Sequence, residues 1–248
     1  MIGFVGSGNM ASAIARGLGE PVLCTDAYPD KARALAEELG GEAIEGNGLL
    51  ADRADVVVLG HKPQQLHEVA EQLGGRARRI ISILGCVSLD ALKSAYGTTP
   101  VVRVLPSTPV AVREGVTVIA EDPQGDAELT RLTTELFERL GTVVTVTEEQ
   151  MGAAMGLMSC APAYMALVAE AQIDAGIKAG LPAPVAQRLA TQTMLGTAKL
   201  IAHEDFDTLA VRRQVTSPGG TTARGLAALE RGGVRAAFLD AMDEVTSR

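Results

Sequence analysis

The stretch Met1-Ile2-Gly3-Phe4-Val5-Gly6-Ser7-Gly8-Asn9-Met10-Ala11 decides the fold of this chain. Residues 2–5 are apolar, as in a short buried strand, and they lead directly into the pattern GxGxxA. In that pattern Gly6 permits a tight turn, Gly8 lets the backbone approach a diphosphate, and Ala11 is small enough for close helix–strand packing. The N–H groups of the following helix then face the diphosphate. The stretch therefore predicts a dinucleotide site, the alternative being a glycine-rich turn without a ligand.

Beyond this motif, short β-branched runs alternate with helix-length amphipathic patterns. Strands are expected at residues 2–5, 22–25, 56–59, 80–84, 101–105, 116–120 and 143–146. Helices are expected at 10–18, 31–39, 64–73, 89–96 and near 127–140. Such alternation is typical of βαβ units, in which a parallel sheet is covered by helices on both faces.

The character of the chain changes after about Thr147, where strand-like runs give way to long helices rich in Ala, Leu and Met. They are expected at 149–179 with a break near Pro162, and at 182–202, 223–230 and 234–245. Helices this apolar are buried better against a second copy of the chain. The predicted fold is α/β: a Rossmann-type dinucleotide-binding domain (1–147) followed by an all-α domain (148–248) for dimerisation and substrate binding.

Composition excludes several classes of partner. The 248 residues include 3% aromatics and no Trp, which argues against stacking platforms for single-stranded nucleic acid. Lys and Arg number 22 against 30 Asp and Glu, so a net charge of −8 disfavours nucleic acid and anionic membranes as partners. The three cysteines are widely spaced and form no CxxC pair, so no metal site is expected.

The sequence is not expected to contain a secretory signal or a membrane-spanning segment. The first residues carry no basic leader, and no apolar segment of 18 uncharged residues is expected. We therefore expect a cytoplasmic protein without a membrane span.

An acidic residue lies at the end of the second expected strand, 20 residues after Gly6. A carboxylate at Asp26 would bind the adenosine ribose hydroxyls and repel a 2′-phosphate. Alternatively, Asp26 caps the turn before Pro29, and Lys31 or Arg33 reaches a phosphate. The expected cofactor is NAD(P)H, with NADH slightly favoured.

Two further loops follow strands at the same carboxyl edge, where ligands bind in such folds. The first contains His61, Lys62 and Pro63; Pro63 rigidifies the turn, and Lys62 either contacts a phosphate or carboxylate or is simply solvated. A lone loop histidine is more often incidental than a general acid. The second is the stiff polar loop around Ser107. The expected cofactor-binding residues are Gly6, Ser7, Gly8, Asn9, Met10, Asp26, His61, Lys62, Pro63 and Ser107.

The segment Ser217-Pro218-Gly219-Gly220-Thr221-Thr222 places two glycines and two threonines just ahead of an expected helix. Backbone N–H groups and hydroxyls would converge there, which favours binding of an anion. The alternative is a loop between helices in which Thr221 or Thr222 caps the next helix.

The glycine motif, the HKPQ at 61–64, the LPSTP at 105–109, the PAY at 162–164 and residues 215–235 together resemble pyrroline-5-carboxylate reductase. The resemblance covers nearly the whole chain and is most specific in VTSPGGTTARGLAALERGGVR, residues 215–235. It implies that a nicotinamide cofactor gives hydride to the cyclic imine carbon of pyrroline-5-carboxylate, the last step of proline synthesis. It also implies a homodimer through interleaved C-terminal helices, often within a larger ring.

The same resemblance implies the roles of the substrate residues. Ser217, Gly220 and Thr221 would hold the substrate carboxylate, and the hydroxyl of Thr222, the expected catalytic group, would lie near the imine nitrogen. Glu148 and Gln214 complete the expected substrate contacts. An imine accepts hydride readily once its nitrogen is protonated or hydrogen-bonded, so neither a catalytic triad nor a metal is needed.

Several positions depart from the family pattern. The family's usual SGSGPAY is MSCAPAY at 158–164, its Asn in PNTP is Ser107, a common Val is His61, and an Asn is Gln214. Two alternatives therefore stay open: a reductase of another cyclic imino acid, and a dinucleotide-binding sensor without turnover. A β-hydroxyacid dehydrogenase with Lys199 as the catalytic residue would leave the 217–222 loop without a role.

Overall fold

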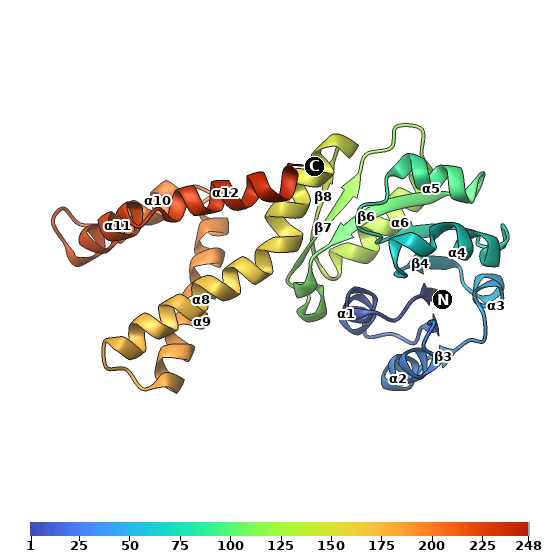
Figure 1. The fold of residues 1–248 in the computed structure, drawn as a ribbon, viewed down its shortest axis with the longest axis horizontal. Helices are drawn as coiled ribbons and strands as arrows, with labels where there is room; N and C mark the ends of the chain where they lie inside the picture. The colour runs from blue at the N-terminus through green and yellow to red at the C-terminus, as the bar shows by residue number, and fades with distance from the viewer. Residues whose placement is uncertain (248) are drawn as a thin grey trace. The chain divides into compact units, whose positions relative to one another are not determined.

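A computed structural model describes residues 1–247, and contacts divide the chain into an N-terminal unit (residues 1–162) and a C-terminal unit that starts at Ala163. Each unit is described by itself below. Figure 1 shows the secondary-structure elements of both.

The N-terminal unit is built on one eight-stranded sheet in the order β3-β2-β1-β4-β5-β6-β7-β8. The strands are β1 (Ile2–Val5), β2 (Leu23–Thr25), β3 (Glu42–Ala43), β4 (Val56–Leu59), β5 (Ile80–Ser82), β6 (Val101–Pro106), β7 (Gly115–Ala120) and β8 (Gly141–Val146). The helices are α1 (Asn9–Leu18), α2 (Pro29–Leu39), α3 (Asn47–Arg53), α4 (Leu66–Leu73), α5 (Leu89–Tyr96) and α6 (Ala127–Glu138), with short 3₁₀ turns at Pro63–Gln65 and Thr108–Val112.

Helices cover both faces of this sheet. On one face, α1, α2 and α6 pack on residues such as Phe4, Val58 and Ile119. On the other, α3, α4 and α5 pack on Val57 and Leu59 and their neighbours. Adjacent residues of β4 thus point into opposite cores, as the two-residue period of a strand requires. The predicted α/β fold is confirmed.

One strand pair departs from the expected parallel sheet. All neighbouring strands pair in parallel except β6 and β7, which are antiparallel, with Leu105 opposite Val118. Only a short 3₁₀ turn, Thr108–Val112, joins β6 to β7. A parallel return needs a crossover of a dozen or more residues, so this short connection reverses the strand.

The chain after β8 is helical without a clean break. A 3₁₀ turn (Glu148–Gln150), α7 (Met151–Ala154) and the π-helical turn η4 (Met155–Cys160) lead into α8 (Ala161–Lys178). The break in the helix that was expected near Pro162 is thus observed as the π-helical turn η4, which ends at Cys160. Met151 and Met158 pack with Leu105, Val118 and Ala120, which is why residues up to 162 belong to the N-terminal unit by contacts.

The C-terminal unit is entirely helical among its described residues. Besides most of α8 it contains α9 (Ala183–His203), α10 (Thr208–Gln214), α11 (Thr221–Arg231) and α12 (Val234–Thr246). Large apolar side chains, among them Leu167, Leu189 and Leu239, are more than half exposed in the single chain.

The helical run Glu148–Lys178 is long and apolar enough to cross a membrane, by length and composition only. The expectation that no such segment exists is therefore wrong on this criterion, because residues 151–169 carry no charged side chain. Only 17% of its most apolar window is buried within the single chain. Core helices of soluble proteins pass the same test, and a partner subunit can cover such a surface.

Candidate functional site

A cleft of about 1440 Å³ lies at the carboxyl edge of the sheet, between the ends of β1, β2 and β4. Most of the expected cofactor residues line it: Gly6, Gly8, Asn9, Met10, Asp26, His61, Lys62 and Pro63. The strand order reverses its direction between β1 and β4, which is the position where open α/β sheets bind nucleotides.

The glycine loop is shaped by two different constraints. Gly6 has φ +98°, and a Cβ placed there would lie 2.7 Å from the carbonyl carbon of Gly60. Gly8 has an extended backbone, and a Cβ there would meet nothing within 4 Å. Gly6 is therefore required by the fold, whereas the space at Gly8 is open to a ligand.

The first turn of α1 opens at the same point. Gly8 is the N-cap and no side chain caps the helix. The first backward hydrogen bond in α1 runs from Ser12 N–H to Gly8 O at 2.9 Å, so the N–H groups of Asn9, Met10 and Ala11 have no partner within the helix. Unpaired N–H groups with the positive end of the dipole suit a diphosphate.

Replacing these two glycines should separate binding from folding. Gly8→Ala should leave the melting temperature nearly unchanged and raise the Kd for NADH about 10–100-fold, because a methyl group would displace the diphosphate from charge-assisted N–H contacts. Gly6→Ala should instead lower the free energy of unfolding by about 2–4 kcal/mol. Thermal unfolding and calorimetric titration check both, and unchanged NADH affinity in Gly8→Ala would place the diphosphate elsewhere.

Asp26 is anchored by two backbone N–H groups. Its Oδ2 accepts from Ser7 N–H at 2.7 Å and its Oδ1 from Tyr28 N–H at 2.8 Å. The turn-capping alternative is thus observed, since Tyr28 directly precedes Pro29. Asp26 nevertheless lines the cleft, so the two roles are compatible.

The loop after β4 contributes a second wall of the cleft. Lys62 is exposed, and its backbone N–H donates to Oε1 of Gln65 at 3.2 Å. His61 Nδ1 lies 2.8 Å from the Lys62 carbonyl oxygen, so Nδ1 carries a proton and donates it to that oxygen. Burial lowers the pKa of His61, and its Nε2 is buried without a partner among residues 1–247. Burial thus disfavours the charged form of His61.

Two expected cofactor residues do not line this cleft. Ser7 is 7% exposed and donates its hydroxyl to Thr25 O at 3.4 Å. Ser107 is 3% exposed, and its Oγ accepts from Val116 N–H at 2.8 Å across the β6–β7 connection. Both hydroxyls thus support loops next to the site.

Sequence inspection missed one polar chain in the cleft. Thr25 Oγ1 donates to Asn47 Oδ1 at 2.6 Å, and Asn47 Nδ2 donates to Gln72 Oε1 at 2.5 Å. Asn47 and Gln72 both line the cleft. The only sequence signal was the turn-like Gly46-Asn47-Gly48, because α3 and the two-residue β3 were not recognised.

The 217–222 loop lies in the C-terminal unit and ends at α11, which begins at Thr221. Its N-cap is Gly220, with no side-chain cap and no acidic residue in the first turn. The alternative in which Thr221 or Thr222 caps a helix starting near Ala223 is therefore wrong. The helix starts two residues earlier because Gly220 supplies the extended N-cap conformation.

At the N-terminus of α11, polar side-chain groups are available to bind a ligand. The Thr222 hydroxyl is exposed and has no hydrogen-bond partner in the described chain. Arg224 lies alongside, with Nη1 3.1 Å from Gly219 O and Nη2 3.5 Å from Thr221 Oγ1. A Cβ at Gly220 would lie 2.4 Å from Ser217 Oγ, so a glycine is needed for the Ser217 hydroxyl to sit against the helix start.

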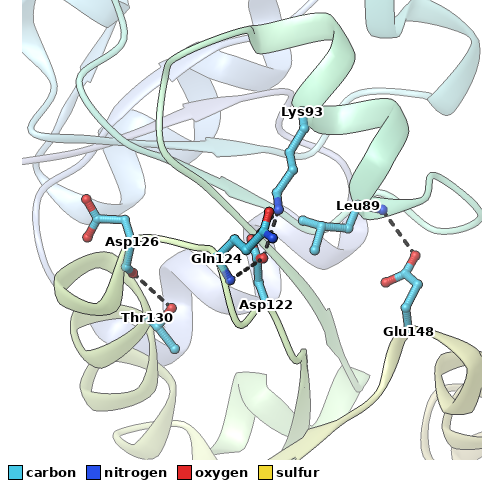
Figure 2. Close-up of polar contacts among 7 residues, drawn as sticks. All are labelled: Leu89, Lys93, Asp122, Gln124, Asp126, Thr130 and Glu148. Carbon is cyan, nitrogen blue, oxygen red and sulfur yellow. Dashed lines mark hydrogen bonds and ion pairs between the residues drawn. The ribbon is translucent and has the colours of Figure 1, made fainter.

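The two remaining expected substrate residues lie in different units. Gln214 is the last residue of α10 and is exposed. Glu148, in the N-terminal unit, accepts from Leu89 N–H at 3.1 Å and pairs with Arg103 through the same Oε1, as Figure 2 shows for the Leu89 contact.

A glycine-loop cleft at the reversal point of a mostly parallel sheet, followed by a helical part with exposed apolar faces, defines a dinucleotide-dependent oxidoreductase with an oligomerising domain. Residues 148–248 match the family "Pyrroline-5-carboxylate reductase dimerisation", and residues 1–85 match "NADP oxidoreductase coenzyme F420-dependent". The chain belongs to the pyrroline-5-carboxylate reductase family.

Full-length relatives support this membership. The pyrroline-5-carboxylate reductase of Synechocystis sp. is 36% identical over 97% of this chain and 94% of its own length. Pyrroline-5-carboxylate reductase 3 of Macaca fascicularis is 34% identical over 100% and 94%. Among solved structures, the Coxiella burnetii reductase superposes with a TM-score of 0.89 at 31% identity, covering 100% of this chain and 96% of that one. The Plasmodium falciparum reductase, solved with NADP bound, gives 0.88 at 26% identity over 99% and 95%.

Proposed function

We propose that this enzyme reduces the cyclic imine pyrroline-5-carboxylate to proline with NAD(P)H, the last step of proline biosynthesis. The observation that carries the proposal is the start of α11, where Ser217–Thr222 leave backbone N–H groups and the Thr222 hydroxyl available in the segment most typical of the family. A cytoplasmic location is proposed with it.

The cofactor would be held by groups on the N-terminal unit. Its diphosphate suits the α1 N-terminus at Gly8, Asn9 and Met10, and Lys62 on the opposite wall adds a positive charge. When bound, the reduced nicotinamide supplies a hydride to the imine carbon, and the ring nitrogen takes a proton from solvent, so that C=N becomes CH–NH.

The substrate would be held by the C-terminal unit. Ser217, Gly220 and Thr221 offer a hydroxyl, a backbone N–H group and a second hydroxyl to the carboxylate at the positive end of α11. The Thr222 hydroxyl donates to the imine nitrogen, which raises the electrophilicity of the adjacent carbon. Gln214, at the end of α10, would add an amide to the substrate contacts.

The enzyme is a homo-oligomer through its dimerisation domain, and we propose a homodimer as the smallest active form. Each active site would then be completed by residues of both chains, since the exposed helices that flank the 217–222 loop are the surface a partner would cover.

We further propose that NADH is used at least as well as NADPH. Asp26 is held by Ser7 N–H and Tyr28 N–H, so its carboxylate stays in the cleft in which the adenosine ribose would bind, where it would repel a 2′-phosphate. Lys31 and Arg33 also line the cleft, but Arg33 is paired with Asp30 and Lys31 lies over the Tyr28 ring, 5.0 Å from its centroid.

Removing the carboxylate should shift this preference. Asp26→Ser should raise the ratio of kcat/KM for NADPH to kcat/KM for NADH about tenfold, because two like charges in partly aqueous surroundings repel by roughly 1–4 kcal/mol. Glu45→Ser, which removes another carboxylate from the same cleft, should leave the ratio within about twofold. A wild-type enzyme that strongly prefers NADPH would refute the proposal.

A label-transfer experiment tests the reaction itself. With NADH carrying two deuterium atoms at C4, proline formed from pyrroline-5-carboxylate should gain one deuterium at the former imine carbon. Cofactor binding without any labelled product would favour the sensor alternative. Labelled product from the six-membered imine alone would favour a reductase of another imino acid.

A further inference from the structure

An ion pair between a buried arginine and a partly exposed glutamate lies outside the proposed contacts with cofactor and substrate. Arg103 is a charged residue in the otherwise apolar strand β6 (VVRVLP), and it is only 9% exposed. Its Nη1 pairs with Glu148 Oε1. Taking the Arg103 charge and part of the Glu148 charge out of water costs free energy that their attraction only partly returns, so stability alone is a weak reason for this pair.

Glu148 connects three elements through one oxygen. Oε1 receives Arg103 from β6 and the backbone N–H of Leu89, the first residue of α5, at 3.1 Å (Figure 2). Glu148 itself begins the 3₁₀ turn that leads into α7 and η4. The carboxylate therefore fixes where the helical run after β8 starts relative to β6 and α5.

One arm of this connection, β6, runs to the carboxyl edge of the sheet, the edge at which the cleft lies. β6 ends at Pro106 and is followed by Ser107, whose hydroxyl holds the β6–β7 connection. From Glu148 the chain reaches Met151 and Met158, which pack against Leu105 of β6. The methionine side chains are apolar and flexible, so their packing does not fix the orientation of the helical run relative to β6. The ion pair is the directional contact between these segments.

The pair is also incompletely satisfied. Arg103 Nε and Glu148 Oε2 are buried and have no partner among residues 1–247. Oε1 of Glu148 is already shared by Arg103 and Leu89 N–H, so a substrate contact at that oxygen would compete with both. The observed contacts therefore favour an indirect role for Glu148 over the expected direct one.

We propose that the Arg103–Glu148 pair is a positioning device, which holds the end of β6 and the η4 turn in the geometry needed for hydride transfer. Arg103 and Glu148 are positioning residues that touch neither cofactor nor substrate. This inference rests on the proposed function, because it concerns the rate of that reaction.

The test compares the full-length wild-type enzyme with Arg103→Met, Glu148→Gln and the double variant Arg103→Met/Glu148→Leu. Glu148→Gln leaves the charge of the buried Arg103 unpaired and is therefore prone to unfold. The double variant removes both charges and should fold. Arg131→Met, which breaks an exposed pair with Glu135 on α6, is the matched control.

In the double variant we expect kcat with pyrroline-5-carboxylate to fall about 10–100-fold, since a misplacement of about 1 Å costs that much. The Kd for NADH and the KM for the imine should stay within about threefold. The kinetic isotope effect with C4-deuterated NADH should increase, because hydride transfer becomes the slow step. A loss of stability alone would reduce the active fraction without changing the isotope effect.

A double variant with kcat within twofold of wild type would overturn the proposal. So would a Glu148→Gln enzyme with a tenfold higher KM for the imine and unchanged kcat, which would indicate direct substrate contact. A wild-type enzyme without turnover contradicts the proposed function itself, so the two failures are distinguishable.

Discussion

Thr222→Val should lower kcat for pyrroline-5-carboxylate reduction about 10²–10⁴-fold, with little change in the Kd for NADH. Valine matches threonine in shape but lacks the hydroxyl that would donate to the imine nitrogen. That hydrogen bond strengthens as the nitrogen becomes an amine, so its loss acts on the transition state rather than on ground-state binding. Steady-state kinetics with saturating cofactor measure the effect.

Three measurements control for a structural effect at this position. Thr222 lies in the first turn of α11, after the N-cap Gly220, so the melting temperature of Thr222→Val should stay close to wild type. Thr222→Ser keeps the hydroxyl and should recover most of the rate. Thr221→Val should mainly raise the KM for the imine, because Thr221 is proposed to hold the carboxylate. A Thr222→Val enzyme with an unchanged kcat would end the catalytic role.

Leu189→Glu should convert the oligomer into monomers and abolish activity. Leu189 is on α9 and is 54% exposed in the single chain. If a partner subunit covers it, a glutamate there would be buried without a counter-charge at a cost of several kcal/mol, which weakens the dimer more than 100-fold. Light scattering and activity measured on the same sample test this.

The matched control is Gln187→Glu, an exposed position half a turn away around α9. It adds the same charge to the same helix and should preserve both assembly and activity. If Leu189→Glu becomes a monomer but keeps full activity, the active site is complete within one chain and the proposal of a shared site is wrong.

The parts of the fold fixed by local sterics could be predicted from the sequence. The glycine motif predicted a tight turn at Gly6, and the structure has φ +98° there. β1, β4 and α5 have the expected bounds, because each combines clear periodicity with a turn or cap residue; Ser88 caps α5 by accepting from Ala91 N–H at 3.2 Å.

Short elements and long-range relations could not be predicted in this way. β3 has only two residues, and α3 and α10 have seven each, so none repeats its period often enough to stand out. The Asp207 cap of α10, which accepts from Leu209 and Ala210 N–H, was the one local signal there. The Arg103–Glu148 pair joins residues 45 positions apart, and neither belongs to a motif that would reveal it.

The substrate loop shows the limit of motif reading most clearly. Its sequence identified Ser217–Thr222 as important, but a cap at Thr222 and a catalytic hydroxyl at Thr222 were equally compatible with it. Because α11 begins at Thr221, Thr222 cannot be the helix cap. The position at which the helix begins, set by the backbone of Gly220, therefore decided between two roles of Thr222 that the residue types alone left open.

The most direct test of the central claim is the rate of NADH and NADPH oxidation by the purified enzyme with pyrroline-5-carboxylate and, separately, with its six-membered homologue. We expect turnover with pyrroline-5-carboxylate at a higher kcat/KM than with the six-membered ring, proline as the product, and NADH used at least as well as NADPH. No oxidation of either cofactor with pyrroline-5-carboxylate, by an enzyme that binds NADH and is correctly assembled, would contradict the account.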